Sequence, residues 1–421
     1  MLNKITIVIG IILVIVVGIF LFLYFTRDNK TNTLSDITTS IRDFFPFGRG
    51  SVATPETDIV KTNPNQNPVL PDTNTAPPRL RQIYPLPVSG SEIFTVASST
   101  FVRFLEKSTG NVHESKTDKN TVERISNTTI PKVTEAVFVK KDAVLLRYLK
   151  DDSDIIETVF GSLGTTTATT AGATTTREVG TPAELVSTYL TPNINGLAVS
   201  DKKDKMFYMT ELDSGARGVI SNPDGSKGAT VFDSPIREWV VQWPKTDTIA
   251  LNTKASAQLP GYLYFLNTVT GKQKLVLGDW LGLTTLTNTN ATKVLHSFND
   301  NAGKMYLQTY KIVGETFSPT LSTPTLTEKC VWSKKNIDIV YCAIPKNLKG
   351  GAYPDDWYKG LISFEDNLWK IDTVTGTTEQ ILNIFEVAGT DIDAVNLSID
   401  AEEKFLVFTN KKNLSLWSYA L

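Results

Sequence analysis

One loop near the C-terminus gathers side chains that could recognise a partner. It runs from Pro345 to Gly360, and within residues 353–358 five positions hold three aromatic residues and two carboxylates: Tyr353, Asp355, Asp356, Trp357 and Tyr358. Aromatic rings supply contact area at low cost in side-chain entropy, and neighbouring carboxylates add hydrogen bonds. Two interpretations are open: the loop forms a binding surface, or it folds back and buries its own aromatics.

The residues that common catalytic and metal sites require are scarce. Two histidines, His113 and His296, are too few for a multi-His metal site, and each lies in a predicted strand or hairpin. The sequence has no Gly-x-Ser-x-Gly elbow, no phosphate-binding Gly-x-x-x-x-Gly-Lys, no dinucleotide fingerprint and no Cys-x-x-Cys. We therefore predict no cofactor and no metal, and favour a non-enzymatic role.

The two cysteines, Cys330 and Cys342, flank a predicted hairpin whose turn centres on Asn336. This spacing places them opposite each other on paired strands, where a disulfide can form if the compartment is oxidising and the Cβ geometry is suitable. The alternative is a pair of buried thiols that act as small hydrophobic residues. The two alternatives have different consequences for where the domain resides.

The N-terminal region contains the strongest single signal in the chain. After a short tail at residues 1–4, the segment from Ile5 to Phe25 has 21 consecutive uncharged residues, enough for a helix of roughly 30 Å. A cleaved signal peptide would have a shorter apolar region followed by small residues, whereas Tyr24 to Arg27 follow here. We predict an uncleaved signal anchor whose residues 5–25 span a lipid bilayer.

The charges beside this segment barely discriminate its orientation, because Lys4 on one side faces Arg27 and Lys30 on the other. The very short N-terminal tail and the candidate disulfide favour a C-terminal domain outside the cytoplasm. Residues 26–78 are rich in Pro, Thr and Asn and are predicted to form a flexible linker. We expect a single-pass membrane protein whose domain stands clear of the bilayer.

The elements that would position the aromatic loop are short strands. From residue 79 to 421, apolar or alternating segments are separated by Gly, Asn, Asp and Lys clusters, which predicts an all-β domain. The segment Leu263–Gly271 recurs as Leu368–Gly376, 105 residues later, with its last four residues identical. Six polar turns follow apolar strands, starting at Lys140, Lys202, Lys245, Asn299, Lys334 and Asp400. These repeats predict a β-propeller of seven four-stranded blades, with six or eight as alternatives.

The chain ends with two strand-like segments, Phe405–Thr409 and Leu414–Tyr419, before a fourth strand of that blade could form. A strand from about residue 79 to 84 is therefore expected to complete the last sheet. Such a pairing removes an exposed sheet edge.

The repeated pattern Leu-Tyr/Trp-x-Ile/Leu-Asp/Asn-x-x-Thr-Gly resembles the degenerate WD40-like blades of TolB-type propellers and of the N-terminal propeller of dipeptidyl peptidase IV. The Gly-His and Trp-Asp dipeptides of true WD40 repeats are absent. The resemblance implies a propeller fold that binds proteins or peptides. No functional residue is carried over from these families, and we expect no hydrolase domain.

The balance of charges argues against nucleic acid as a partner, because the formal net charge is −2 with both signs interspersed. The sequence favours a membrane-anchored, non-catalytic propeller that acts as a scaffold for a protein or peptide partner in the cell envelope or at the cell surface. Two alternatives are a carbohydrate-active or metal-dependent propeller enzyme using scattered carboxylates, and a purely structural envelope protein.

Overall fold

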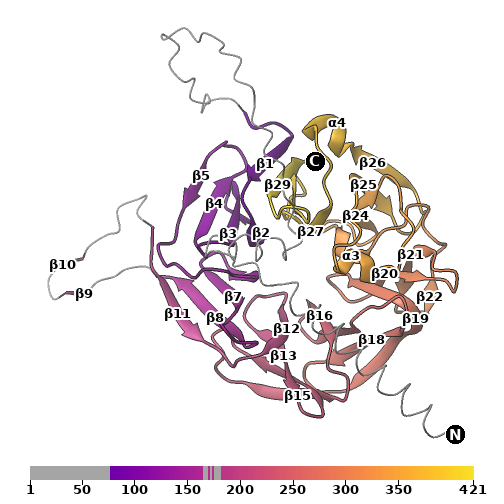
Figure 1. The fold of residues 1–421 in the computed structure, drawn as a ribbon, viewed down its shortest axis with the longest axis horizontal. Coiled ribbons are helices and arrows are strands. Elements are labelled where there is room, and N and C mark those ends of the chain that lie inside the picture. The colour runs from indigo at the N-terminus through magenta and orange to yellow at the C-terminus, as the bar shows by residue number, and fades with distance from the viewer. Residues whose placement is uncertain (1–75, 165–168, 171–172, 175–181) are drawn as a thin grey trace, which may run out of the picture. The chain divides into compact units, whose positions relative to one another are not determined.

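The computed structural model describes residues 76–164, 169–170, 173–174 and 182–421, which form an all-β fold of sheets arranged around a common centre (Figure 1). The predicted tail at 1–4, the membrane span at 5–25 and nearly all of the linker at 26–78 lie outside these residues. Within them, no helix combines the length and the apolar character needed to cross a bilayer.

Within these described ranges the strands form five four-stranded sheets, one seven-stranded sheet and one two-stranded sheet, and all pairs of named strands are antiparallel. Three four-stranded sheets come first along the chain, in the orders β2–β3–β4–β5, β6–β7–β8–β11 and β12–β13–β14–β15. Their strands are β2 (Val88–Val96), β3 (Ser99–Glu106), β4 (Val112–Lys116), β5 (Val122–Arg124), β6 (Glu135–Lys140), β7 (Ala143–Leu149), β8 (Ile156–Leu163), β11 (Leu185–Tyr189), β12 (Ile194–Val199), β13 (Met206–Leu212), β14 (Gly215–Ser221) and β15 (Ala229–Ser234). The two-stranded sheet pairs β9 (Thr169–Thr170) with β10 (Ala173–Thr174).

The remaining strands form the seven-stranded sheet and two further four-stranded sheets, β23–β24–β25–β26 and β1–β29–β28–β27. Their strands are β16 (Trp239–Lys245), β17 (Thr248–Thr253), β18 (Pro260–Asn267), β19 (Gln273–Thr287), β20 (Lys293–Asn299), β21 (Met305–Lys311), β22 (Thr316–Phe317), β23 (Cys330–Trp332), β24 (Ile339–Pro345), β25 (Asp366–Asp372), β26 (Thr378–Leu382), β27 (Ala394–Ile399), β28 (Phe405–Asn410), β29 (Leu416–Ala420) and β1 (Leu80–Tyr84). Three short helical segments join them: the 3-10 helix η1 (Thr327–Lys329), α3 (Asp355–Tyr358) and α4 (Ile384–Ala388).

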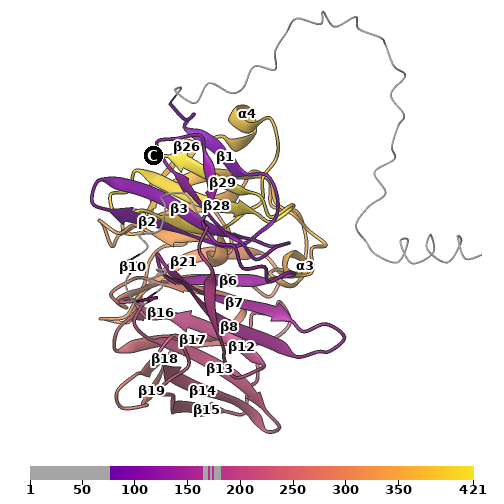
Figure 2. The same cartoon turned by 90° about the vertical axis from the view of Figure 1, so that its left-hand side faces the viewer.

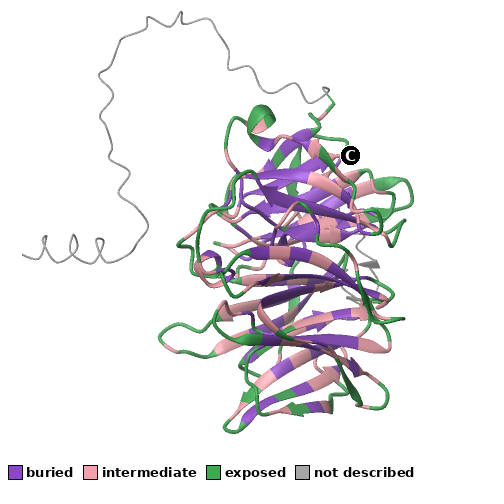
Figure 3. Ribbon diagram, turned by 90° about the vertical axis from the view of Figure 1, so that its right-hand side faces the viewer, coloured by how far each residue is buried: buried purple, intermediate pink, exposed green. Residues whose placement is uncertain are grey.

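The core lies between neighbouring sheets, which stack face against face (Figure 2). Buried strand faces are distributed through the stack (Figure 3). One cluster joins Phe207 and Met209 of β13 to Trp239 and Trp243 of β16. The strands of a sheet that is buried on both faces have short, mostly apolar sequences. This pattern is why the strands could be recognised in the sequence.

The long strand β19 belongs to two sets of strand pairs. Its residues 273–281 pair with β18, and its residues 281–287 pair with β20. The backbone turns within the strand, where Gly282 has a φ of +63° and the register shifts between Leu281 and Thr284. A Cβ at Gly282 would lie 2.3 Å from the Asn299 amide nitrogen and 2.8 Å from the Tyr353 carbonyl oxygen, so only glycine fits there.

The expected pairing of the domain's two ends is confirmed. β1 pairs antiparallel with the C-terminal strand β29, with Leu80 opposite Tyr419 and Gln82 opposite Trp417. Ile83 of β1 then joins a buried cluster that includes Phe104 of β3 and Leu416 of β29. The last sheet therefore packs on the first sheet of the domain.

All six predicted polar turns connect two paired strands. Five of them join the first two strands of a sheet: β6–β7, β12–β13, β16–β17, β23–β24 and β27–β28. The turn at Asn299 differs, because it joins β20 to β21, which are inner strands of the seven-stranded sheet. The preceding turn begins at Asn288 and joins β19 to β20, and the Asn288 side-chain oxygen accepts hydrogen bonds from the backbone N–H groups of Thr292 and Lys293.

The repeated Thr-Gly hairpins connect the third and fourth strands at two of three places. Gly271 lies between β18 and β19 and Gly376 lies between β25 and β26, with φ of +67° and +74°. The positive φ explains the recurring glycine, since other residues rarely adopt this conformation. A third Thr-Gly pair upstream, Thr109-Gly110, follows the apolar segment Phe101–Leu105; Gly110 has the same positive φ but lies between β3 and β4, the middle strands of its sheet.

The docking of β1 can be tested by a matched pair of substitutions on that strand. Ile83 is 6% exposed, whereas Gln82 points to solvent. We expect Ile83→Ala to lower the free energy of unfolding by about 2–4 kcal/mol through lost burial and cavity formation, and Gln82→Ala to change it by less than about 0.5 kcal/mol. Equal small effects in denaturant unfolding would show that β1 is not part of the core.

Candidate functional site

The predicted recognition loop connects β24 to β25 and contains the four-residue helix α3, Asp355–Tyr358. Tyr353 and Trp357 are 2% and 4% exposed. They pack in a buried cluster with Leu326, Phe364 and Val395. Two of the five predicted side chains are therefore unavailable to a partner, as in the alternative in which the loop buries its own aromatics.

The two carboxylates of the loop hold backbone in place. Asp355 accepts hydrogen bonds from the Ala257 backbone N–H (2.6 Å) and the Ser256 hydroxyl (3.3 Å), both in the loop between β17 and β18. Asp356 accepts from the Ala352 N–H at 2.8 Å, within its own loop. The α3 loop thus reaches from one sheet to another and works as a brace.

Tyr358 is the aromatic residue of α3 that remains accessible, with 36% of its surface exposed. It lines a cavity of about 490 Å³, which we call the α3 cavity. The other lining residues come from the β12–β15 sheet, from β16 and the residue before it, from the β17–β18 loop and from η1: Asn195, Glu211, Glu238, Trp239, Val240, Lys254 and Glu328. This volume is within the range of protein cavities that bind small groups.

Two of the three carboxylates in the α3 cavity have cationic partners. Glu211 pairs with Arg237 at 2.9 Å, and Glu238 pairs with Lys254 at 3.2 Å. All four side chains are about half exposed or more, so these pairs contribute little to stability.

Glu328 has a different environment. Its Oε1 accepts a short hydrogen bond from the Tyr358 hydroxyl, and no lysine, arginine or histidine nitrogen among the described residues lies within 4.0 Å of its carboxylate. Burial raises the pKa of Glu328, while the Tyr358 hydroxyl opposes the rise. Burial and then the Glu328 carboxylate raise the pKa of Tyr358, so Tyr358 keeps its proton and remains the donor.

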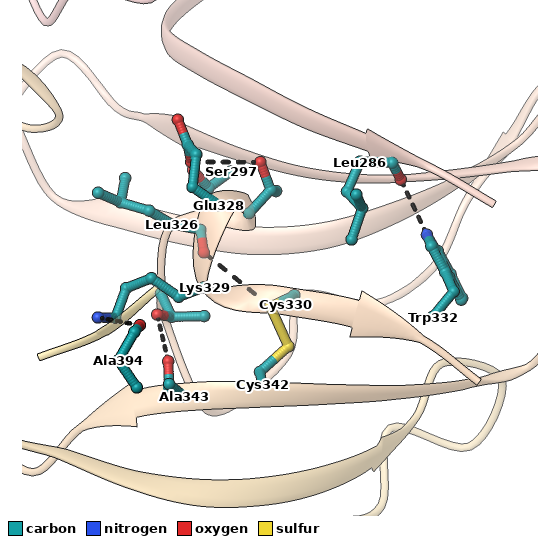
Figure 4. Close-up of a disulfide and its surroundings, with 12 residues drawn as sticks. Leu286, Ser297, Leu326, Glu328, Lys329, Cys330, Trp332, Cys342, Ala343 and Ala394 are labelled. Atoms are coloured by element: carbon teal, nitrogen blue, oxygen red, sulfur yellow. Dashed lines mark hydrogen bonds between the residues drawn. A yellow bond between two sulfur atoms is a disulfide. The ribbon is translucent and has the colours of Figure 1, made fainter. Parts of the chain in front are cut away.

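A buried charged cluster lies behind α3. Lys329, whose side chain is 0% exposed, donates to Asp366 (2.7 Å), to Asp393 and to the Ala394 carbonyl oxygen (3.0 Å). Figure 4 shows the last contact next to the disulfide. The Trp357 ring lies 5.5 Å from the ammonium, which adds a cation–π contact. We call Lys329, Asp366, Asp393 and Trp357 the lysine cluster.

The two carboxylates of the lysine cluster differ in their donors. Asp393 accepts from Lys329, from the Trp357 indole N–H (2.9 Å) and from the Phe364 backbone N–H (3.0 Å). Although burial disfavours its charge, these donors hold the pKa of Asp393 below its usual range. Asp366 has fewer donors, and its Oδ1 has no partner, so burial raises its pKa to about 6 despite Lys329.

Cys330 and Cys342 form a disulfide with an S–S distance of 2.08 Å (Figure 4). They are directly opposite each other on β23 and β24, the register that the sequence spacing predicted. Because Glu328 and Lys329 immediately precede Cys330, this bond fixes the strand that starts beside both the α3 cavity and the lysine cluster.

The two histidines lie apart, in β4 and β20, and both have aromatic neighbours. Burial lowers the pKa of His113, which stacks on Phe104 at 5.4 Å. Burial also lowers the pKa of His296 to about 4, and neither of its ring nitrogens has a hydrogen-bond partner. Both imidazoles therefore act as neutral packed rings at pH 7.

A more open cavity of about 1130 Å³ lies between the β3–β4 and β7–β8 hairpins, and its lining includes Lys107, Lys132 and Asp151. Lys132 and Asp151 pair there with side chains 71% and 74% exposed, so water screens them. Among the described residues, no group of three or more His, Cys, Asp or Glu side chains could hold a metal ion. The α3 cavity, with its aromatic walls and an unpaired carboxylate, is the better candidate site.

Sequence reasoning missed Glu328 and the lysine cluster apart from Trp357. One signal was available: Asp366 and Asp393 lie at or just before the first residue of a buried strand, β25 and β27, where an apolar residue is usual. Lys329 likewise directly precedes β23. A charge at such a position indicates a buried partner, but the sequence does not say which one.

No family model matches this sequence, and no curated protein matches it. Similar solved structures include TolB from Acinetobacter baumannii (11% identity, TM-score 0.43, 68% of this chain and 64% of that chain) and the β-propeller domain of the Trilobed protease from Pyrococcus furiosus (12%, 0.48, 79% and 95%). Another is the WD40 domain of Neurospora crassa Pan2 (8%, 0.45, 79% and 89%). These neighbours are β-propellers of the TolB-like and WD40 types. The match spans less than two thirds of TolB, and all three likenesses concern the fold alone.

The unequal carboxylates of the lysine cluster predict a pH effect. The folded state holds the Asp366 proton up to about pH 6, whereas the unfolded chain releases it near the ordinary value of about 4. The stability from this proton is complete below pH 4 and is lost as the pH rises to 6. Asp366→Asn cannot titrate at this position. We therefore expect the free energy of unfolding of Asp366→Asn, measured relative to that of the wild type, to increase by on the order of 2–3 kcal/mol as the pH rises from 4 to 7.

Melting curves recorded by circular dichroism at half-unit pH steps measure this difference. His296 titrates in the same range with the opposite sign but is present in both proteins, so it cancels. Asp213→Asn, at an exposed position, is the control. A difference between Asp366→Asn and the wild type that stays constant across this range contradicts the assignment.

Proposed function

We propose that this protein is a membrane-anchored propeller that acts as a binding scaffold outside the cytoplasm and engages a protein or peptide partner at the α3 cavity. The observation that carries the proposal is the composition of that cavity. The rings of Tyr358 and Trp239 and the side chain of Val240 provide apolar walls, and Asn195 and Glu328 provide hydrogen-bonding groups. Such a combination is typical of sites that recognise peptides.

We further infer seven blades, with the seven-stranded sheet counted as two blades that share β19. The two halves of β19 pair with different partners, which supports this division. Buried clusters also join each blade to the next, for example Leu145 with Met206 and Leu295 with Val340. The cluster of Ile83, Phe104 and Leu416 joins the last blade to the first, as a closed ring of seven requires.

The membrane anchor rests on the 21 uncharged residues from Ile5 to Phe25, and export rests on the disulfide. Disulfides persist in oxidising compartments and are rare in the cytosol. The linker at 26–78 would then hold the domain at a distance on the order of 40 Å from the bilayer surface.

A photo-crosslinking amino acid tests the binding site directly. At position 358 it would stand in the α3 cavity, and at position 374 it would stand in the exposed β25–β26 loop, at the opposite end of the same sheet. We expect a discrete, light-dependent adduct in intact cells from position 358 and none from 374. Equal adducts from both positions, or none from 358, would remove the α3 cavity from the proposal.

Topology is tested separately. With a C-terminal tag, we expect added protease to remove the tag from intact cells or spheroplasts, and Cys330 and Cys342 of the denatured protein to resist thiol reagents until a reductant is added, because both are buried in the folded state. A tag that stays protected until lysis, together with freely reactive thiols, would place the domain in the cytoplasm and contradict export.

A further inference from the structure

Resting on the proposed function of the α3 cavity, we infer that the partner inserts a cationic side chain there, the ammonium of a lysine or the guanidinium of an arginine. The lining holds three carboxylates and one ammonium. The ligand class follows from which of these charges are already paired and from the shape of the apolar walls.

The exposed charged residues of the α3 cavity pair with each other, whereas the Glu328 carboxyl group has no cationic partner among the described residues. Arg237 and Lys254 are occupied by Glu211 and Glu238, through contacts of 2.9 and 3.2 Å. Glu328 has no cation within reach among the described residues and is less accessible than the rim pairs. A cation that enters the cavity therefore meets one carboxylate with no competing partner.

The Glu328 carboxylate also keeps unused capacity to accept hydrogen bonds. Tyr358 donates to Oε1, whereas Oε2 lies 3.5 Å from the Thr327 hydroxyl, the outer limit of a hydrogen bond, and the Thr284 hydroxyl also faces the carboxylate. Thr327 is itself bound to the Thr284 hydroxyl at 2.9 Å. An ionised carboxylate can accept about four hydrogen bonds, so Oε2 is open to a charged donor.

The Glu328 carboxylate is held in position by the residues that follow it in the chain. It belongs to η1, whose last residue, Lys329, is fixed by the lysine cluster and is followed by Cys330, which is fixed by the disulfide. A side chain that is already fixed in position loses little conformational entropy when a ligand binds. Its interaction with a cation therefore contributes more fully to the binding affinity.

The walls fit the rest of such a side chain. Lysine and arginine bury their alkyl stems along apolar surfaces, and their cationic ends are attracted to aromatic faces. Trp239, Val240 and Tyr358 provide both kinds of surface around the cavity. A carboxylate ligand would instead meet Glu328 and be repelled.

The test uses the full-length protein in detergent and phage-displayed random octapeptides as probes. The tightest binder is synthesised with an acetylated or a free N-terminus, and with each lysine or arginine replaced by norleucine, which keeps the stem and removes the charge. We expect loss of one cationic side chain to weaken binding about tenfold or more, with no dependence on the N-terminus.

Protein variants assign the charge to its receptor. Glu328→Gln, which still accepts from Tyr358, is expected to weaken the lysine or arginine peptide about tenfold and to leave the norleucine peptide unchanged. Tyr358→Phe keeps the aromatic ring and leaves the Glu328 carboxylate free, so we expect this variant to keep its affinity for the cationic peptide. If Glu328→Gln folds poorly, binding by Tyr358→Phe still tests the site. Glu379→Gln, at an exposed position on β26, is the matched control.

The outcomes separate the two levels of the proposal. Binding that is lost in Tyr358→Ala but depends neither on a lysine or arginine of the peptide nor on Glu328 would contradict the inserted cationic side chain and keep the α3 cavity as the binding site. Loss in Tyr358→Ala together with dependence on the free N-terminus of the peptide would have the same meaning. If binding is the same in Tyr358→Ala, Glu328→Gln and the wild type, both the cationic ligand and the proposed site are contradicted.

Discussion

The buried ammonium of Lys329 is the constraint on which the rest of this site depends. A charge with no exposed surface must be paired and hydrogen-bonded, and Lys329 meets this requirement with two carboxylates and a carbonyl oxygen from β25 and from the start of β27. Two carboxylates around one ammonium leave an excess negative charge. The donors from the α3 loop, the Trp357 indole and the Phe364 amide, stabilise that charge on Asp393.

This requirement explains why the aromatic loop is a brace rather than a flat recognition surface. Trp357 must face inward to donate to Asp393 and to cover Lys329. Lys411, in the last sheet's β28–β29 turn, donates to the Trp357 carbonyl oxygen at a distance of 2.8 Å. Asp355 holds the other side of α3 to the β17–β18 loop. With α3 fixed at both ends, the next residue, Tyr358, lines the α3 cavity and bonds Glu328.

Features that depend on local pattern could be predicted from the sequence. The strand runs, the Thr-Gly hairpins at Gly271 and Gly376, the opposed cysteines and the pairing of β1 with β29 all follow from periodicity, turn chemistry and the need to cover a sheet edge. The turn at Asn299 was correctly placed after an apolar strand, but unlike the other five it joins inner strands of a sheet, because β19 runs on from one sheet region into the next.

Features that depend on packing between sheets could not be predicted. Lys329, Asp366 and Asp393 are spread over 65 positions of the sequence and meet only because three strand ends converge. The sequence identified Tyr358 as a candidate but could not separate it from Trp357, since two adjacent aromatics of a four-residue helix look alike until their neighbours are known. Glu328 escaped notice because a single glutamate before a cysteine carries no motif.

Hydrogen–deuterium exchange of residues 352–362 in the full-length protein tests the central claim most directly. The Tyr358 amide donates to the Pro354 carbonyl oxygen and the Leu361 amide to that of Asp356, both at 2.9 Å, within a loop that contacts two other sheets. The account predicts that this segment exchanges as slowly as the flanking strands β24 and β25. Exchange as fast as that of an exposed loop would contradict the brace, and with it the fixed position of Tyr358 in the α3 cavity.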